Sequence, residues 1–543
     1  MLERALGMAV AVAMAGSFLG VGVRAATEPS NTPGTKPANV ADAMTHSEEP
    51  KAPQINGAKV FGVRPGNPFL FTIPATGAEP ITYSAEGLPD GLTLDAGNGR
   101  ILGVLKDDQR GDHVVTLHAK NSFGEASEQF KIVVGDTLAL TPPMGWNSWN
   151  CWAGAVDQEK VLASAKAMVD KGLVKHGWTY INIDDTWQGK RGGPLNAIQP
   201  NEKFPDMKAL CDQVHAMGLK IGIYSTPWKT SYAHYIGGSA DNAEGTWQTP
   251  PTTRPKFGTA GSPWSLGTHS FAAADAKQWA QWGFDYLKYD WNPNQVPETK
   301  EMADALKASG RDIVYSLSNY TPFANIPELS KLANCWRTTG DIRDTWYSMT
   351  GNGFSQAKWA PFASPGHWND PDMLVVGYVG WGPKLHESAL THDEQYTHIS
   401  LWCLLSSPLL IGCDMTRLDD FTVGLLTNDE VLSVNQDPSG HQAVPVVESD
   451  EKVTIPRENN RPGSHTYPQT QVWAKTLSDG SQAVGLFNLG DKEAPVTVKW
   501  ADLKIDGEKT VRDLWKRQDI GKATGEYTAT VPSHGVVMVK ISG

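Results

Sequence analysis

Two short apolar segments of the chain each end on an aspartate that could act in catalysis. Residues 286–291 read Tyr-Leu-Lys-Tyr-Asp-Trp and contain Asp290, while residues 336–342 read Trp-Arg-Thr-Thr-Gly-Asp-Ile and contain Asp341. In a (β/α)₈ barrel the carboxyl ends of the strands meet at one face, where polar residues are catalytic candidates. Two carboxylates that face each other across a pocket can break a glycosidic bond, one as nucleophile and one as proton donor. The pair therefore predicts a glycoside hydrolase.

Such a site needs a scaffold that brings strand ends together, and the central part of the chain predicts one. Between about residues 138 and 440, strand-like and helical stretches alternate. This alternation predicts a parallel sheet, and eight strands favour a closed barrel. A doubly wound open sheet is the alternative, although no Gly-x-Gly-x-x-Gly follows the first strand. The strands are expected near Met144, Ile181, Ile221, Leu287, Val314, Trp336, Met373 and Leu410.

The segments on either side of this barrel have a different residue pattern. Residues 52–135 and 441–543 contain short alternating runs separated by turn residues, which predict an N-terminal β-sandwich and a C-terminal antiparallel β-sandwich. The first of these contains Gly-Leu-Pro-x-Gly-Leu-x-Leu and then Gly-x-Ile-x-Gly, and it resembles the bacterial immunoglobulin-like (cadherin-like) modules found beside secreted enzymes. Residues 1–25 have the pattern of a signal peptide, and residues 26–51 that of a flexible linker.

Composition excludes several classes of partner. Among 543 residues the net charge is −12, which argues against nucleic acid and against anionic membranes. After the signal peptide no segment is long and apolar enough to span a bilayer, so we expect an exported protein, periplasmic or extracellular. Five cysteines without a metal-ligand spacing make a structural zinc unexpected, and a disulfide is possible but not required. Twenty tryptophans are expected mainly in the core, with some facing sugar.

Polar side chains follow nearly every predicted strand. A single aspartate at such a position usually caps a helix or lies in a solvated turn, but a whole ring of polar groups favours a pocket for the hydroxyls of a monosaccharide. Adjacent carboxylates can hold neighbouring hydroxyls through charge-assisted hydrogen bonds. Lys288 lies two residues before Asp290, on the same side of the strand, and is expected to keep that acid ionised. The ring consists of Trp149, Asp184, Asp185, Tyr224, Lys288, Asp290, Ser318, Arg337, Asp341 and Asp372.

Seven ordered motifs resemble the α-galactosidases of glycoside hydrolase family 27. They are Met-Gly-Trp-Asn-Ser-Trp (144–149), Ile-Asp-Asp-x-Trp (183–187), Gly-Ile-Tyr (222–224), Leu-Lys-Tyr-Asp (287–290), Trp-Arg-Thr-Thr-Gly-Asp-Ile (336–342), Trp-Asn-Asp-Pro-Asp-Met-Leu (368–374) and Val-Asn-Gln-Asp-Pro-x-Gly (434–440).

The resemblance implies a retaining mechanism that needs no metal and no organic cofactor. By position in the motifs, Asp290 matches the nucleophile and Asp341 the acid/base, whose pKa is expected to rise when substrate fills the pocket. The residues that match the lining of the galactose pocket are Trp149, Asp184, Asp185, Tyr224, Lys288, Arg337 and Asp372. The implied partner is a carbohydrate substrate; the sequence does not indicate an oligomeric state.

The chain departs from the family at two places. Asn292 stands where many relatives have a cysteine two residues after the nucleophile. After the fifth strand, Ser318 and Tyr320 replace the cysteine and tryptophan that border the 2-position of the sugar in plant and fungal enzymes. A bulky Tyr320 favours a plain 2-hydroxyl, so α-galactosidase is preferred. The alternatives are α-N-acetylgalactosaminidase, β-L-arabinopyranosidase, isomalto-dextranase and a catalytically silent glycan-binding protein, although such proteins usually lose one of the two acids.

Overall fold

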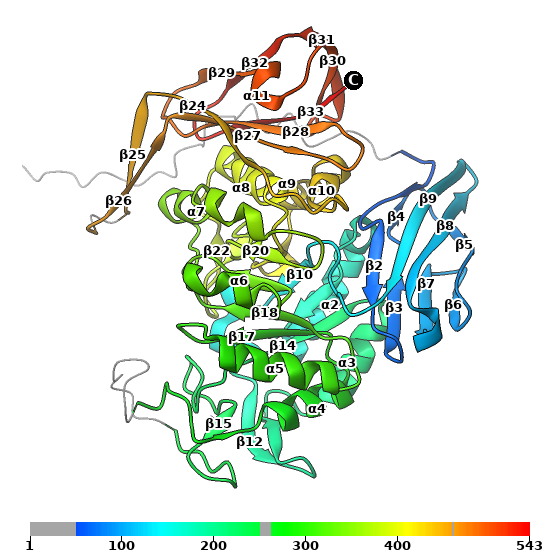
Figure 1. The fold of residues 1–543 in the computed structure, drawn as a ribbon, viewed down its shortest axis with the longest axis vertical. Coiled ribbons are helices and arrows are strands. Elements are labelled where there is room, and N and C mark those ends of the chain that lie inside the picture. The colour runs from blue at the N-terminus through cyan, green and yellow to red at the C-terminus, as the bar shows by residue number, and fades with distance from the viewer. Residues whose placement is uncertain (1–49, 250–261, 459–460) are drawn as a thin grey trace, which may run out of the picture. The chain divides into compact units, whose positions relative to one another are not determined.

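The computed structural model describes residues 50–249, 262–458 and 461–543, which all belong to one compact unit. The predicted signal peptide and nearly all of the predicted linker lie outside these residues. Among the described residues no helix is long and apolar enough to cross a membrane. The chain folds into an N-terminal sandwich, a central barrel and a C-terminal sandwich (Figure 1), which confirms the predicted fold class.

The N-terminal module is a sandwich of short strands. One sheet has the order β2-β9-β8-β5, a second has the order β3-β7-β6, and β1 pairs with β4. Apolar side chains that alternate along these strands, among them Phe69, Ile101, Val115 and Ile132, fill the space between the sheets. The strands are β1 (Gln54–Ile55), β2 (Val60–Val63), β3 (Pro68–Thr72), β4 (Ala75–Thr76), β5 (Thr82–Glu86), β6 (Leu92–Leu94), β7 (Arg100–Val104), β8 (Gly111–Asn121) and β9 (Gly124–Val134).

The central domain is a closed barrel of eight parallel strands. From the first to the seventh, each strand pairs with the next, and the eighth pairs with the first. The barrel closes beyond the end of the seventh strand, where Leu374 forms a single parallel β-bridge with Ile411 of the eighth. The strands are β10 (Met144–Asn147), β11 (Tyr180–Asn182), β14 (Lys220–Ser225), β17 (Tyr286–Asp290), β18 (Val314–Ser318), β19 (Cys335–Arg337), β20 (Trp368–Asp370) and β23 (Leu409–Ile411).

The predicted position of the seventh strand was wrong by a few residues. Met373 was expected in it, but β20 ends at Asp370, before Pro371. Proline has no N–H to donate to the sheet, and Asp372 has a φ of 88°, in the left-handed region, so the extended ladder cannot continue through them. This turn places the Asp372 side chain at the carboxyl end of the barrel.

Helices cover the outside of the barrel; α3, α4 and α5 can be followed outside the strands in Figure 1. Several begin at a residue whose side chain accepts a hydrogen bond from the first turn, as Asp157 does for α2 and Thr391 for α8. The helices are α1 (Trp149–Trp152), α2 (Gln158–Asp170), α3 (Met207–Ala216), α4 (Ala272–Trp282), α5 (Val296–Ala308), α6 (Ile326–Leu329), α7 (Trp346–Gly353), α8 (His392–Leu404), α9 (Asp420–Leu426) and α10 (Asp429–Asn435). Short antiparallel pairs in the loops are β12 (Gln188–Gly192) with β13 (Ala197–Pro200), β15 (Ser239–Ala240) with β16 (His269–Ser270), and β21 (Tyr378–Val379) with β22 (His386–Glu387).

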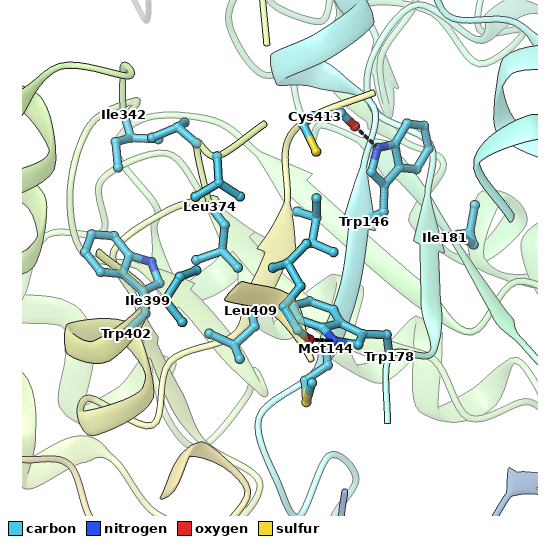
Figure 2. Close-up of a cluster of buried hydrophobic side chains, with 14 of the residues drawn as sticks. Met144, Trp146, Trp178, Ile181, Ile342, Leu374, Ile399, Trp402, Leu409 and Cys413 are labelled. Atoms are coloured by element: carbon cyan, nitrogen blue, oxygen red, sulfur yellow. Dashed lines mark hydrogen bonds between the residues drawn. The ribbon is translucent and has the colours of Figure 1, made fainter. Parts of the chain in front are cut away.

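Buried tryptophans stabilise the barrel core by packing and by hydrogen bonds. Figure 2 shows Trp146 of β10 among the apolar side chains of neighbouring strands, with its indole N–H donating to the carbonyl oxygen of Cys413 at 2.8 Å. Trp178 and Trp402 are fully buried in the same cluster. Each indole buries a large apolar area and also satisfies a backbone carbonyl that would otherwise lack a partner.

The C-terminal sandwich packs a six-stranded sheet of order β24-β27-β28-β33-β30-β31 against the pair β29–β32. A further hairpin, β25–β26, extends away from the rest of this sandwich (Figure 1). Its elements are β24 (Val444–Glu448), β25 (Lys452–Pro456), β26 (Ser464–Pro468), β27 (Thr470–Thr476), β28 (Gln482–Asn488), β29 (Ala494–Lys499), α11 (Trp500–Leu503), β30 (Glu508–Asp513), β31 (Gln518–Thr524), β32 (Glu526–Val531) and β33 (Val536–Ser542).

A buried lysine of β27 joins this sandwich to the barrel. Lys475 donates to the carbonyl oxygens of Cys403 at 3.3 Å and Val434 at 2.7 Å, and to Ser406 Oγ at 2.6 Å. Cys403 and Val434 lie in the last turns of α8 and α10, where backbone carbonyls lack helical partners and favour a cation. One side chain thus stabilises two helix ends.

We predict that Lys475→Met lowers the free energy of unfolding by about 2–4 kcal/mol, because buried acceptors lose their donor. Thermal and urea unfolding followed by tryptophan fluorescence would measure the loss. Lys452→Met on β25, where the lysine is exposed, is the matched control and should change little. An equal effect of the two substitutions would contradict this role for Lys475.

Candidate active site

The predicted polar residues converge at the carboxyl ends of the barrel strands. One small cavity at this end is lined by side chains from six of the strands or the turns that follow them, with Lys288, Ser318, Arg337 and Asp372 among them. Asp290, at the end of β17, lies beside Tyr224 of β14, and Asp184 follows β11. The strand-end rule therefore placed these residues in one site, although they come from segments far apart in the sequence.

Asp290 is buried and carries one free oxygen. Its Oδ2 accepts a hydrogen bond from the Tyr224 hydroxyl at 3.0 Å, and its Oδ1 has no hydrogen-bond partner among the described residues. Burial raises the pKa of Asp290 to about 7, against the charge of Lys288, which lowers it. Lys288 lowers the pKa of this carboxyl, but loss of water costs the carboxylate more than the nearby cation returns.

Lys288 forms an ion pair with a different acid, Asp184. Its Nζ donates to Asp184 Oδ2 at 2.8 Å, and both side chains are nearly inaccessible to solvent. Burial opposes the charge of Lys288, but Asp184 and Asp290 outweigh it and raise the pKa of the ammonium group. Lys288 therefore remains a cation between two carboxylates and lowers the cost of holding both of them in the pocket.

Asp341 lies on the loop after β19 and is half exposed, with 54% of its side-chain surface accessible. Arg337 approaches its Oδ1 at 3.4 Å and pairs more closely with Asp372 Oδ2, at 2.9 Å. Burial acts to raise the pKa of Asp341, but the charges of Arg337, Lys288 and Arg343 outweigh it and hold the pKa below its ordinary value. The two acids thus lie in opposite electrostatic environments.

Asp372 is fixed from two sides. Its backbone carbonyl accepts a 2.7 Å hydrogen bond from the indole of Trp402, and its Oδ2 accepts one from the backbone N–H of Ile342 at 2.8 Å. Trp402 comes from α8 in the core shown in Figure 2, so the strained turn at Asp372 is held by the barrel itself. Through Ile342, Asp372 also positions the loop that carries Asp341.

Asp185 has partners of a different kind. Its Oδ1 accepts from the Gln188 amide at 2.9 Å, and its Oδ2 accepts from the backbone N–H of Ala233 at 3.0 Å. These bonds tie the loop after β14 to the end of β11. Asp185 therefore positions a wall of the pocket, whereas Asp184 beside it lies against Lys288.

Two predicted residues lie at the edges of the site. Tyr320 is 49% exposed and lines the cleft beside Asp341, not the small cavity that contains Lys288. Trp149 begins α1 directly after β10, and its backbone N–H donates to Asn147 Oδ1 at 2.9 Å. The predicted roles of Tyr320 and Trp149 in sugar binding are not decided by these positions.

Sequence reasoning missed Tyr232 and Arg343. Burial raises the pKa of the Tyr232 hydroxyl, and the charges of Asp290 and Asp341 raise it further, so this ring lies near both acids. It belongs to the long loop after β14, where length predicted a functional wall but no spacing singled out a residue. Arg343 lies two residues after Asp341 and lowers the pKa of that acid.

Comparisons with known proteins agree with this geometry. The family model described as "Alpha galactosidase A" matches residues 141–249 and 256–437, more than half of the chain. The chain belongs to this family. A model described as "Alpha galactosidase C-terminal beta sandwich domain" matches residues 468–541, and one described as "Putative Ig domain" matches residues 52–135. The predicted resemblance to the α-galactosidases of glycoside hydrolase family 27 is confirmed.

Individual relatives cover most of the chain. An α-galactosidase of Coffea arabica is 38% identical over 410 residues, which are 74% of this chain and 94% of the relative. The crystal structure of a "putative alpha-galactosidase" of Bacteroides fragilis has a TM-score of 0.77 at 32% identity and covers 91% of this chain and 98% of its own. A β-L-arabinopyranosidase of Geobacillus stearothermophilus has a TM-score of 0.61 at 28% identity, covering 75% and 98%.

The environment of Asp290 predicts an unusual titration. A solvated aspartate titrates near pH 4, so replacing it would not change proton uptake around neutrality. Because the pKa of Asp290 is raised to about 7, the wild type should release about one more proton between pH 5.5 and 8.5 than Asp290→Asn does. Potentiometric titration measures this difference. Asp241→Asn, at an exposed acid of the loop after β14, is the control; identical curves for wild type and Asp290→Asn would contradict the raised pKa.

Proposed function

We propose that this family member removes terminal α-galactose residues from α-galactosides by double displacement, with Asp290 as nucleophile and Asp341 as acid/base. The observation that carries the proposal is the pairing of a buried carboxylate that has one unpartnered oxygen with a half-exposed carboxyl beside an open cleft. The free oxygen of the first can attack the anomeric carbon, and the second can reach both the leaving group and water.

In the first step Asp290 Oδ1 attacks the anomeric carbon while Asp341 donates its proton to the glycosidic oxygen. The bond to the leaving group breaks, and a galactosyl ester of Asp290 forms. The Tyr224 hydroxyl holds Oδ2 and so orients Oδ1 toward the sugar. In the second step Asp341 accepts a proton from water, which attacks the same carbon and frees the carboxylate of Asp290.

The active form of the two acids carries one proton, on Asp341. In the free protein the preference is reversed, because Asp290 has the higher pKa and Asp341 the lower. Substrate that covers Asp341 removes water from it and raises its pKa, while Lys288 remains beside Asp290 to support the carboxylate. Binding of the substrate therefore places the proton where the first step requires it.

The remaining charged groups suit a sugar rich in hydroxyls. We assign sugar binding to Trp149, Asp184, Asp185, Tyr224, Lys288, Arg337 and Asp372, and place Ser318 and Tyr320 near the 2-position. Asp184, Lys288, Arg337 and Asp372 form two buried ion pairs, Lys288–Asp184 and Arg337–Asp372, whose remaining lone pairs and N–H groups can accept from and donate to hydroxyls. A neutral sugar thereby gains directional hydrogen bonds without adding charge to the pocket.

The stereochemistry of the product tests the proposal. With 4-nitrophenyl α-galactoside as substrate, proton NMR should show α-galactose as the first product, because two inversions retain the configuration. Initial β-galactose would contradict double displacement. Faster cleavage of the N-acetylgalactosaminide or of the β-L-arabinopyranoside than of the α-galactoside would favour those alternative activities.

We also propose that the protein is exported and that residues 1–25 are removed on the way. The support is the apolar, small-residue run from Ala5 to Val21, which follows Arg4, and the cleavage site offered by Val23-Arg24-Ala25. N-terminal sequencing of the protein recovered outside the cytoplasm should begin at about residue 26. Recovery of the full-length chain in the cytoplasm alone would contradict export.

A further inference from the structure

A large cleft opens beside Asp341, next to the small cavity that holds Lys288. Its volume is about 860 Å³, within the range of sites that bind small organic molecules. Its walls come from the loop after β19, from α7, from Trp381 and from Arg457, Glu458, Arg461 and His465 of the β25–β26 hairpin. The barrel and the C-terminal sandwich therefore both contribute to the space around the acid/base.

The β25–β26 hairpin is held against α7 by specific contacts. The ring of His465 on β26 stacks on Tyr347 of α7, with 4.1 Å between centroids, and Glu458 accepts a hydrogen bond from the Tyr347 N–H at 3.2 Å. The hydroxyl of Tyr467 donates to the carbonyl oxygen of Thr350 at 3.3 Å. A Cβ on Gly351 would approach His465 to 2.6 Å, so this surface of the helix is shaped for the hairpin.

Cations gather in this cleft although the protein as a whole is acidic. Four cationic side chains line the cleft. None of them forms a side-chain ion pair within the described part of the chain, and all four are exposed. Three acids also line the cleft: Asp341, Asp344, which is buried and faces His386 at 3.0 Å, and Glu458, which accepts from the Tyr347 N–H. Four cations against three acids leave a positive excess, which is unexpected in a protein with a net charge of −12. The four cations are Arg343, Lys358, Arg457 and Arg461.

Aromatic rings hold two of these cations in place. The guanidinium of Arg343 lies over Trp381 at 4.5 Å from the ring centroid, and Lys358 lies over Phe323 at 5.3 Å. Contact with a ring restricts the side chain without neutralising its charge. Arg457 and Arg461 line the cleft from the β25–β26 hairpin, whose strands contact α7.

We propose that this cleft binds the leaving group of the substrate and selects one that carries a negative charge, a carboxylated or sulfated sugar. Asp341 must protonate the glycosidic oxygen, so the leaving group has to lie on its side of the cleaved bond, where the cleft is. Unpaired guanidinium groups bind carboxylate and sulfate oxygens in a forked geometry. The inference rests on the proposed function and adds a class of substrate to it.

Binding to a variant that cannot turn over gives the cleanest test. Calorimetry with Asp290→Ala would compare 4-carboxyphenyl and 4-sulfophenyl α-galactoside with the neutral 4-carbamoylphenyl compound. We expect the charged compounds to bind about three- to tenfold more tightly at low salt, with the advantage largely lost at about 0.5 M NaCl. Tighter binding of both anions would indicate recognition of negative charge in general. Tighter binding of only one would show whether the carboxylate or the sulfonate is recognised.

Substitutions separate the cleft from the rest of the protein. Arg457→Gln combined with Arg461→Gln in the Asp290→Ala protein should reduce the ratio of the affinities, and Arg110→Gln, at an exposed arginine of the N-terminal module, should not. Equal affinity for charged and neutral compounds, or a ratio unaffected by the double substitution, would overturn the inference. Failure of the wild type to cleave the neutral compound would instead count against the proposed function, and the binding comparison would still stand.

Discussion

The site depends on keeping several charges out of water within one small pocket. Within the described residues Asp290 receives a single hydrogen bond, from Tyr224, and burial works against its charge. Isolated, such a carboxylate would be too costly to bury. The neighbouring ion pairs, Lys288 with Asp184 and Arg337 with Asp372, interleave positive and negative groups around it. The paired opposite charges thus lower the free energy needed to bury these groups. The pKa of Asp290 remains raised because burial outweighs the charge of Lys288.

Indole groups of the core hold the ends of the strands on which these charges lie. Trp187 donates to the carbonyl oxygen of Tyr224 at 2.8 Å, and Trp402 donates to that of Asp372 at 2.7 Å. Trp146 does the same for Cys413, just beyond the last strand. The richness in tryptophan noted in the sequence thus reflects the core, as expected. In addition, two of these three indoles fix the backbone of a residue of the site.

Much of this arrangement could be predicted because the strand-end rule is local. Asp290 and Arg337 end their strands and Asp184 follows one closely, so their convergence followed once eight parallel strands were counted. The turn at Asp372 depends on Pro371, which was visible in the sequence but was not weighed as the end of a strand. Motif order then supplied the family, whereas composition alone would have given only a soluble protein with several domains.

Other features depend on tertiary structure and could not be read from the sequence. The pKa of Asp290 is set by how completely the pocket excludes water, and no spacing of residues reports this. The position of the β25–β26 hairpin against α7 joins segments about a hundred residues apart, as the contact between Tyr347 and His465 shows. The exposure of Tyr320 likewise follows from a loop conformation, and it weakens the expectation of a rigid wall at that point.

The central claim is that Asp290 becomes covalently bonded to the sugar. A fluorinated galactosyl substrate with a good leaving group slows both steps, and the second can be slowed enough for the ester to accumulate. Mass spectrometry of a digest should then find the fluorinated galactosyl group on the peptide that contains Asp290, and Asp290→Ala should remain unlabelled. A label on another residue, or turnover of α-galactosides by the Asp290→Ala protein at the wild-type rate, would contradict the account.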